Sequence, residues 1–338
     1  MSVSIAVDAM GGDRAPGEIV RGAVLGAKEY SDVNLILVGD QRLIEGELCS
    51  SETKNIAPEA KKRIGIHHAG EVIQMGESPA LALRKKKDAS IRRAAELMAK
   101  GEAECVISAG NTGAAVAAFT LLLKPLPKVL RPGIAVSFPA GKSVCTVIDV
   151  GANIQCKPIH LFQYAIMASV FSHYIFGVEN PKVGLLNIGA EVAKGTEVLK
   201  QAHELLSRSN LNFVGNVEGN DIHTGNCNVI VCDGFVGNVM LKLSEGLSFH
   251  ILDTIEKALE AEHPEALEDI RAELDILRRR NDYSEYGGAP LLGVDGLAII
   301  CHGSSDRRAM RNAVRVAREF SKFQVNKHIV AELASFDT

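Results

Sequence analysis

Tryptophan does not occur in this chain, and aromatic residues make up only 5% of its 338 residues. Surfaces that stack bases or sugars on aromatic rings are therefore not expected. An excess of positive charge is also lacking, because 37 Lys and Arg stand against 41 Asp and Glu, a formal net charge of −4. Proteins that bind the phosphate backbone of nucleic acids normally carry a strong basic excess, so we expect no nucleic acid partner.

Paired cysteine motifs and long apolar runs are missing as well. The 7 cysteines are odd in number, no CxxC occurs, and several lie in apolar runs, so we expect reduced, buried thiols and no metal site. The longest apolar stretch, residues 113–123, is well short of the roughly 20 residues that a membrane span needs. The first residues lack the pattern of a signal peptide. These features predict a cytoplasmic protein that does not cross a membrane.

Short apolar runs alternate with helical patterns along the chain. We expect strands at Ser4–Val7, Asn34–Val38, Ile64–His67, Glu104–Ser108, Ile134–Phe138, Val144–Ile148, Val183–Asn187, Asn212–Val217, Val229–Cys232 and Leu297–Cys301. The clearest helix is Ala89–Lys100, with Asp88 as its N-cap and Gly101 as its stop. This alternation predicts an α/β protein in which a mainly parallel sheet lies between two layers of helices, a three-layer α/β/α sandwich.

One region has a different character. Leu243–Asn281 is long, helical in pattern and rich in charge, and Pro264 is expected to divide it into two helices. No linker rich in Pro, Gly or Ser divides the chain. We therefore expect a single α/β domain over residues 1–338, from which residues 243–281 protrude as a helical insertion.

Seven of the expected strands are followed by loops rich in Gly, Asn, Asp and Ser. These loops are residues 8–13, 108–113, 149–153, 187–189, 218–221, 233–238 and 302–306. Glycine lets the backbone approach a ligand closely, and the N–H groups that open the next helix favour an anion. Ligands of open parallel sheets bind at the carboxyl ends of the strands, so we expect the seven loops to meet at one edge and bind phosphate or a phosphorylated group.

Cationic side chains near these loops are available to neutralise such an anion. Arg84–Lys87, Lys157 and Lys194 lie close to them, and His302 stands at a strand end, either facing a ligand or as a hydrogen-bonded loop residue. The GxGxxG, GxxxxGK[ST] and GxSxG motifs do not occur after any expected strand. Their absence disfavours dinucleotide binding, nucleoside triphosphate binding and a serine nucleophile, and we expect no cofactor.

Nine segments, in order and over nearly the whole chain, match one family. They are IAVDAMGGD (5–13), ALRKKKDASI (82–91), SAGNTGA (108–114), IDVGANIQCKP (148–158), VGLLNIGAEVAKG (183–195), FVGNVEGNDI (213–222), VCDGFVGNVMLK (231–242), YGGAPLLGV (286–294) and HGSS (302–305). On these segments the sequence resembles the bacterial phosphate acyltransferases of phospholipid synthesis. It departs from the family pattern at Arg14, Thr196 and Asn220, where the family more often has His, Asn and a basic residue.

The resemblance implies an activity, a fold and partners. The family transfers a fatty acyl group from acyl carrier protein to inorganic phosphate, which yields acyl phosphate without a cofactor. Its fold is similar to that of phosphotransacetylases and isopropylmalate dehydrogenases, with two intertwined halves, and it is usually a homodimer. Acyl carrier proteins are acidic, so we expect contacts with Arg271, Arg278, Arg279 and Arg280. The helical region also implies peripheral membrane contact, although its many glutamates fit a solvated hairpin equally well.

The chemistry assigns roles to the loop residues. Because phosphate is itself the nucleophile, the enzyme has to position it and stabilise the oxyanion of a tetrahedral intermediate. We expect Lys157, Lys194 and the amides of Gly110–Gly113 to clamp phosphate, and His302 to protonate the leaving thiolate. The expected oxyanion donors are Asn111, Asn153 or Ser304, with Asp8, Asp149 and Asp233 as residues that orient donors. The other expected substrate-binding residues are Gly11, Gly12, Asp13, Lys86, Ser108, Thr112, Glu218 and Asn238.

Three alternatives stay open. A phosphotransacylase that acts on short-chain acyl-coenzyme A would use the same fold and the same loops. An NAD-dependent decarboxylating dehydrogenase would need paired Asp metal ligands and an Arg-rich substrate motif, an arrangement that the sequence lacks. A non-catalytic ligand-binding regulator would have little use for so complete a set of family loops.

Overall fold

The computed structural model describes all residues except 1, 51–52, 54–57, 281–282 and 337–338. Its strands are β1 Val3–Asp8, β2 Val33–Gly39, β3 Ile64–His68, β4 Cys105–Ser108, β5 Gly133–Ala140, β6 Ser143–Ile148, β7 Lys182–Leu186, β8 Asn212–Val217, β9 Val229–Val231, β10 Ala289–Leu292 and β11 Leu297–Ile300. Its helices are α1 Gly17–Glu29, α2 Gln41–Leu48, α3 Pro58–Lys61, α4 Pro79–Lys85, α5 Ser90–Ala99, α6 Thr112–Leu122, α7 Pro158–Phe176, α8 Glu197–Ser207, α9 Gly234–Glu262, α10 Pro264–Arg280, α11 Arg307–Lys322 and α12 Val325–Ser335, with short 3₁₀ turns at Gly219–His223 and Tyr283–Tyr286.

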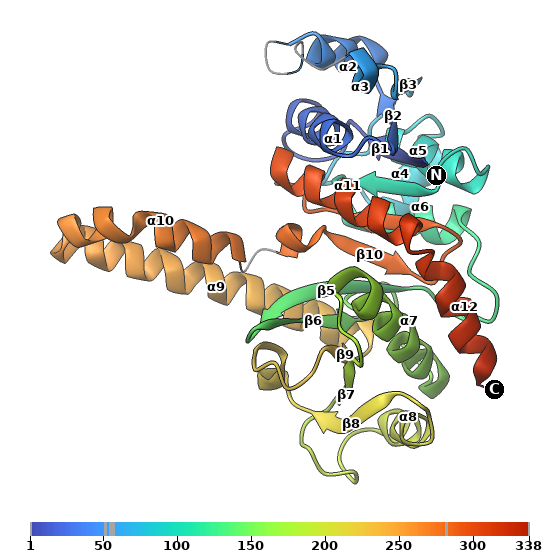
Figure 1. Ribbon diagram of the computed structural model, residues 1–338, viewed down its shortest axis with the longest axis vertical. Helices are drawn as coiled ribbons and strands as arrows, with labels where there is room; N and C mark the ends of the chain where they lie inside the picture. The colour runs from blue at the N-terminus through green and yellow to red at the C-terminus, as the bar shows by residue number, and fades with distance from the viewer. Residues whose placement is uncertain (1, 51–52, 54–57, 281–282, 337–338) are drawn as a thin grey trace.

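Within these residues the strands form one 11-stranded sheet in the order β3-β2-β1-β4-β11-β10-β5-β6-β9-β7-β8. Helices cover both of its faces (Figure 1). Side chains alternate between the faces, so that Ile5 and Val7 of β1 pack in one core cluster and Ala6 packs in the other. The predicted α/β/α sandwich with a mainly parallel sheet is confirmed.

All ten expected strands are present, and one further strand was not foreseen. The strand β10 is only four residues long and contains Pro290, a residue that normally argues against a strand inside a sheet. It pairs antiparallel with β11 on one side and with β5 on the other.

The antiparallel pair β5–β6 changes the geometry of the loops. Because β10 is antiparallel to both of its neighbours, β5 runs in the same direction as β11. The antiparallel pair β5–β6 then reverses the direction, so that β6, β7, β8 and β9 run opposite to β1, β4 and β11. The carboxyl ends of the two sets therefore lie at opposite edges. The expectation that all seven loops meet at one edge is wrong: residues 8–13, 108–113 and 302–306 share one edge, and the other four loops share the opposite one.

The predicted cap of the Ala89 helix is also wrong. The N-cap of α5 is Ala89, without a side-chain hydrogen bond. The carboxylate of Asp88 instead accepts a hydrogen bond from the Gly70 N–H at 2.6 Å and pairs with Arg93 at 2.8 Å. Asp88 thus joins the start of the helix to the preceding loop.

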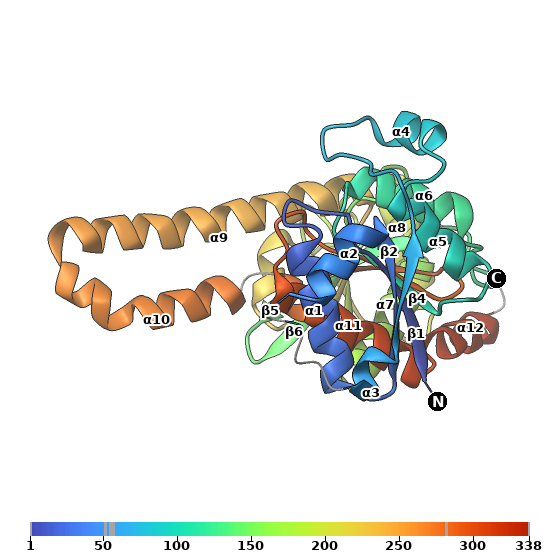
Figure 2. The ribbon, with the colours of Figure 1, turned by 90° about the horizontal axis from the view of Figure 1, so that it is seen from above.

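The helical segment protrudes as predicted. Helix α9 begins at Gly234, earlier than expected, and α10 begins at Pro264 as foreseen. Figures 1 and 2 show the two helices as a long antiparallel hairpin that extends away from the sheet. Leu252, Leu267 and Leu274 form a small apolar cluster of their own. The side chain of Arg280 and residue Asn281 lie outside the described part of this segment. No helix among the described residues is long and apolar enough to cross a membrane.

Candidate active site

Three loops meet at the edge where β1, β4 and β11 end. The Ser108 hydroxyl donates a hydrogen bond to the Asp8 carboxylate at 2.6 Å and accepts one from the Gly110 N–H at 3.1 Å. The Asp13 N–H donates to the Gly303 carbonyl at 2.8 Å, which joins the first loop to the third. These bonds fix the three loops relative to one another.

The close approach of the three loops requires glycine at two positions. A β-carbon on Gly11 would lie 2.5 Å from Asp8 Oδ2 and 2.7 Å from the Gly110 nitrogen. Gly12 has φ +107°, and a β-carbon there would lie 3.1 Å from the carbonyl oxygens of Ala109 and Gly303. Any larger residue would separate the loops or strain the backbone.

Asp8 lies beneath this junction and is 1% exposed. Burial raises the pKa of its carboxyl group, and the hydrogen bond from Ser108 opposes that rise. The Met10 N–H also donates to this carboxylate, at 3.3 Å. Asp8 is therefore placed to hold the loops together.

His302 and Ser304 form a hydrogen-bonded pair on the surface of the third loop. His302 Nδ1 lies 2.7 Å from the Ser304 hydroxyl and 3.2 Å from the Ser304 backbone nitrogen. Because a backbone N–H can only donate, Nδ1 is an acceptor, and in the neutral ring the proton lies on Nε2. The exposed Nε2–H can thus donate a hydrogen bond to a bound group.

The second loop opens helix α6 with backbone donors. Asn111 caps this helix through its side-chain oxygen, which accepts a hydrogen bond from the Ala114 N–H. No hydrogen bond of the described structure uses the N–H groups of Thr112 and Gly113. They are oriented by the helix start and are available to an anion.

The side chain of Asn111 itself has a bracing role. Its Nδ2 contacts the carbonyl oxygens of Gln74, Met75 and Glu77 at 2.9–3.2 Å. Its donors are therefore occupied, and the expectation that Asn111 donates to an oxyanion is not supported by this geometry. Lys86 braces the same segment, because its ammonium group donates to the Val72 carbonyl at 2.7 Å and pairs with Glu77.

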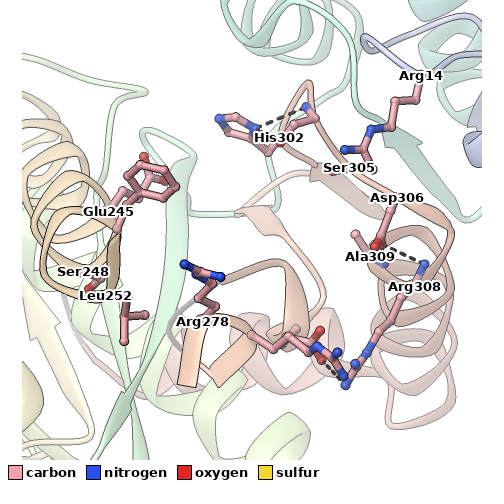
Figure 3. A pocket seen from close by; sticks show the side chains of 14 residues that line it. Arg14, Glu245, Ser248, Leu252, Arg278, His302, Ser305, Asp306, Arg308 and Ala309 are labelled. Carbon is pink, nitrogen blue, oxygen red and sulfur yellow. Dashed lines mark hydrogen bonds and ion pairs between the residues drawn. The ribbon is translucent and has the colours of Figure 1, made fainter. Parts of the chain in front are cut away.

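A cavity of about 760 Å³ lies beside these loops, between α9 and α10 on one side and the start of α11 on the other (Figure 3). Arg14 reaches towards it beside Ser305, whose hydroxyl is buried and has no hydrogen-bond partner in the described structure. Phe249 and Leu252 give the α9 side an apolar character. The cavity lining is Arg14, Glu245, Ser248, Phe249, Leu252, Arg278, Arg279, Glu285, His302, Ser304, Ser305, Asp306, Arg308 and Ala309.

The arginines of this cavity are not equivalent. Arg278 pairs with Glu256, and Arg308 pairs with Glu285 at 3.0 Å. Arg14 and Arg279 have no carboxylate partner among the described residues. Their charge is therefore free to attract an anionic ligand. Sequence analysis placed Arg279 on a partner surface and Ser305 in the third loop, but it did not place the two in one cavity, because only folding brings the hairpin against that loop.

The loops at the opposite edge are held by Asp149. This residue is fully buried, and its carboxylate accepts hydrogen bonds from the backbone N–H groups of Ile134, Gly151, Ala152 and Asn153 at 2.7–3.1 Å. Burial raises the pKa of the Asp149 carboxyl group, and these donors act in the opposite direction.

Asn153 is occupied in the same way as Asn111. Its Nδ2 contacts the Pro132 carbonyl at 2.7 Å, the Tyr164 hydroxyl at 2.8 Å and Asp149 at 3.2 Å. Asn153 therefore does not project a free donor, and it lies at the edge opposite to His302. The expected role as an oxyanion donor is not supported here either.

The other expected site residues at this edge are separated from the first edge by the sheet. Lys157 opens α7 and Lys194 lies exposed after β7, so one chain does not bring them together with Gly110–Gly113, and the expected clamp is corrected. Asp233 caps α9 by accepting from the Phe235 and Val236 N–H groups at 3.0 Å. Glu218 opens a 3₁₀ turn, and Asn238 lies on α9 near Gly151.

Helix α9 connects the two edges. Its first residue, Gly234, donates its N–H to the Asn153 carbonyl at 2.8 Å. Residues 245–252 of the same helix line the cavity beside His302. The described residues contain no group of three or more His, Cys, Asp and Glu side chains that could hold a metal ion.

Comparison with known proteins gives consistent matches over nearly the whole chain. The model of a family described as "Fatty acid synthesis protein" matches residues 3–328. The phosphate acyltransferase of Pelotomaculum thermopropionicum is 45% identical over 337 residues, which covers 99% of this chain and 96% of that protein. The phosphate acyltransferase of Desulforamulus reducens is 48% identical and covers 94% of this chain and 93% of that protein.

Solved structures support the fold at much lower identity. A phosphotransacetylase from Streptococcus pyogenes superposes with a TM-score of 0.63 at 15% identity and covers 95% of this chain and 94% of that one. A branched-chain phosphotransacylase from Enterococcus faecalis gives 0.55 at 14% identity, with coverage of 94% and 98%. These two likenesses concern the fold alone.

Proposed function

This chain belongs to the fatty acid synthesis protein family, among the phosphate acyltransferases, and from that premise we propose that it transfers a fatty acyl group from acyl carrier protein to inorganic phosphate. The observation that carries the proposal is the meeting of three loops beside the cavity. There, unused N–H groups of Thr112 and Gly113 lie on the same edge as the His302–Ser304 pair and Arg14.

The reaction forms one bond and breaks one. A phosphate oxygen attacks the thioester carbonyl, the carbon–sulfur bond breaks, and acyl phosphate and a thiol leave. Backbone amides of the second loop and the Arg14 guanidinium hold the phosphate charge. His302 donates a hydrogen bond from its Nε2–H to the departing sulfur, and the thiolate takes up the proton that the phosphate loses, directly or through water. No serine or cysteine nucleophile is required.

Acyl carrier protein is the proposed acyl donor because the cavity opens beside the hairpin. Among the arginines expected to contact it, Arg271 and Arg278 are engaged in ion pairs with Glu256. Arg279 is exposed and without a carboxylate partner in the described region, so we assign the acidic partner to Arg279 and Arg14. The alternative donor is a short-chain acyl-coenzyme A, which the same cavity would accept.

A homodimer is the proposed assembly. Helix α9 carries an exposed apolar stripe at spacings of four, formed by Val239, Leu243, Leu247 and Ile251, each at least 47% exposed. A second copy would cover this stripe. The glutamates of the hairpin favour a protein surface over a lipid surface, and liposome flotation at low and physiological salt tests whether the peripheral membrane contact also exists.

Trapping with hydroxylamine tests the activity. The protein is incubated with a long-chain acyl-(acyl carrier protein) and inorganic phosphate, and acyl phosphate is captured as hydroxamate. We expect hydroxamate only when phosphate is present, and a lower yield with a short-chain acyl-coenzyme A. If the coenzyme A thioester is the better donor, the alternative is correct. If neither thioester gives phosphate-dependent hydroxamate, the proposal is wrong.

A further inference from the structure

A second large groove lies on the outer side of the helices, away from the cavity at His302. It has a volume of about 1120 Å³ and is bordered by α7, α8 and the end of α12. Figure 1 shows α12 ending beside α7. Its apolar surface comes from Leu130, Ile159, Phe162, Leu205 and Phe336. Leu130 is 58% exposed, so this surface lacks a cover in the single chain.

The charged residues of this groove all have the same sign. Lys128, Lys157 and Arg208 line it, and its described lining contains no Asp or Glu. None of the three takes part in an ion pair of the described structure. These three cations border the apolar surface of the groove.

One side of the groove is held in a fixed conformation. Lys128 has φ +67°, a backbone conformation that residues other than glycine rarely adopt. The buried side chain of Gln163 fixes it, since Nε2 donates to the Lys128 carbonyl at 2.7 Å and Oε1 accepts from the Leu130 N–H at 2.9 Å. Backbone strain of this kind is found at positions that contact ligands.

We propose that this groove binds a long-chain acyl phosphate, with the alkyl chain on the apolar surface and the phosphate among the three cations. The identity of the ligand rests on the proposed function, because acyl phosphate is its product. A phosphate monoester carries close to two negative charges at neutral pH, which three cations match better than the single charge of a carboxylate. The groove would hold the reactive product away from the cavity where it forms.

Calorimetric titration with dodecyl phosphate, below its micelle concentration, tests the site without relying on turnover. We expect binding that weakens with salt and that is about fifteenfold tighter for dodecyl than for decyl phosphate, because each of the two extra buried methylenes contributes about fourfold. Inorganic phosphate alone should bind far more weakly. Laurate that binds as tightly as dodecyl phosphate would show that the phosphate is not recognised and would overturn the assignment.

Variants test whether dodecyl phosphate binds in the groove and not elsewhere on the surface. Lys128→Gly removes a cation and suits the positive φ, and combined with Arg208→Gln it should weaken binding of dodecyl phosphate at least tenfold. Leu205→Glu, which places a carboxylate on the apolar surface, should weaken it similarly. Lys200→Gln, an exposed lysine of the same helix α8 outside the groove, is the matched control and should stay within twofold.

The outcomes distinguish this inference from the proposed function. If the wild type and the double variant bind dodecyl phosphate with equal affinity and have equal unfolding midpoints, the assignment of the groove is overturned, even if the enzyme forms hydroxamate. Binding seen only in a chain that ends at Phe336 would show that the protein's own last residues occupy the groove, and would also overturn it. Conversely, a protein that binds dodecyl phosphate in the groove but forms no acyl phosphate would contradict the proposed function alone.

Discussion

The ion pair between Glu18 and Arg307 ties together two of the three loops at the active edge. Glu18 lies in the first turn of α1, which follows residues 8–13, and Arg307 opens α11, which follows residues 302–306. The carboxylate accepts the Arg307 backbone N–H at 3.0 Å and its guanidinium at 2.6 Å. The hydrogen bond from Arg307 lowers the pKa of Glu18 from 4.5 to about 2.

This lowered pKa sets the size of the effect of Glu18→Gln. A fall from 4.5 to about 2 corresponds to about 3 kcal/mol of folding free energy. Because the Arg307 side chain is 41% exposed, screening by solvent reduces the contribution to about 1–2 kcal/mol. We expect Glu18→Gln to lower the free energy of unfolding by this amount at pH 7.

The pH dependence gives the decisive readout. A carboxyl group whose pKa is lowered in the folded state stabilises the protein above its unfolded pKa and loses this effect as the pH falls towards the folded pKa. The difference between wild type and Glu18→Gln, measured by urea unfolding with far-ultraviolet circular dichroism, should therefore be constant above pH 6 and fall to less than about half at pH 3.

Glu29→Gln is the matched control on the same pair of helices. Glu29 pairs with Arg311 across α1 and α11, but the two side chains are 40% and 39% exposed. Its loss should cost less than about 1 kcal/mol. If both variants lose the same stability, or if the Glu18→Gln difference does not depend on pH, the reasoning from partial burial and charge is refuted.

Two further predictions concern the junction of the loops. Burial raises the pKa of Asp8 above 3.8, so its carboxyl group stabilises the fold at low pH and loses that effect as the pH rises through the raised value. Urea unfolding should show that the stability of the wild type relative to Asp8→Asn falls as the pH rises above about 4, and a pH-independent difference would contradict this. Gly12→Ala should lower the free energy of unfolding by about 1–3 kcal/mol, because alanine there meets two carbonyl oxygens at a positive φ. Its control, Gly46→Ala in α2, has nothing within 4 Å and should be neutral or stabilising by about 0.5–1 kcal/mol.

Local patterns predicted the elements of this fold well. The apolar runs marked ten strands, and Pro264 marked the break in the hairpin. The strand β10 was missed because Pro290 and its short length conceal it. The direction of the strands reverses in the hairpin β5–β6, whose two strands are only two residues apart. The expected strands at Ile134–Phe138 and Val144–Ile148 were not read as this hairpin, and so the separation of the loops into two edges was missed.

The candidate site shows a related limit. Asn111 and Asn153 lie in glycine-rich loops, as ligand donors often do, yet both amides are used to brace neighbouring backbone. A sequence does not tell whether an amide faces a ligand or a carbonyl, because that depends on which loop packs beside it. Arg14, Arg279 and Ser305 meet only through tertiary packing of the hairpin against the third loop.

The Michaelis constant for phosphate in Arg14→Gln tests the proposed site most directly. Hydroxamate formation is measured over a range of phosphate concentrations at saturating acyl-(acyl carrier protein), for the wild type, Arg14→Gln and the exposed control Arg42→Gln on α2. Loss of one charged hydrogen bond should raise the KM for phosphate about 10-fold or more in Arg14→Gln and leave Arg42→Gln within about twofold of the wild type. An unchanged KM in a folded, active Arg14→Gln protein would contradict the placement of phosphate at the edge shared by residues 8–13, 108–113 and 302–306.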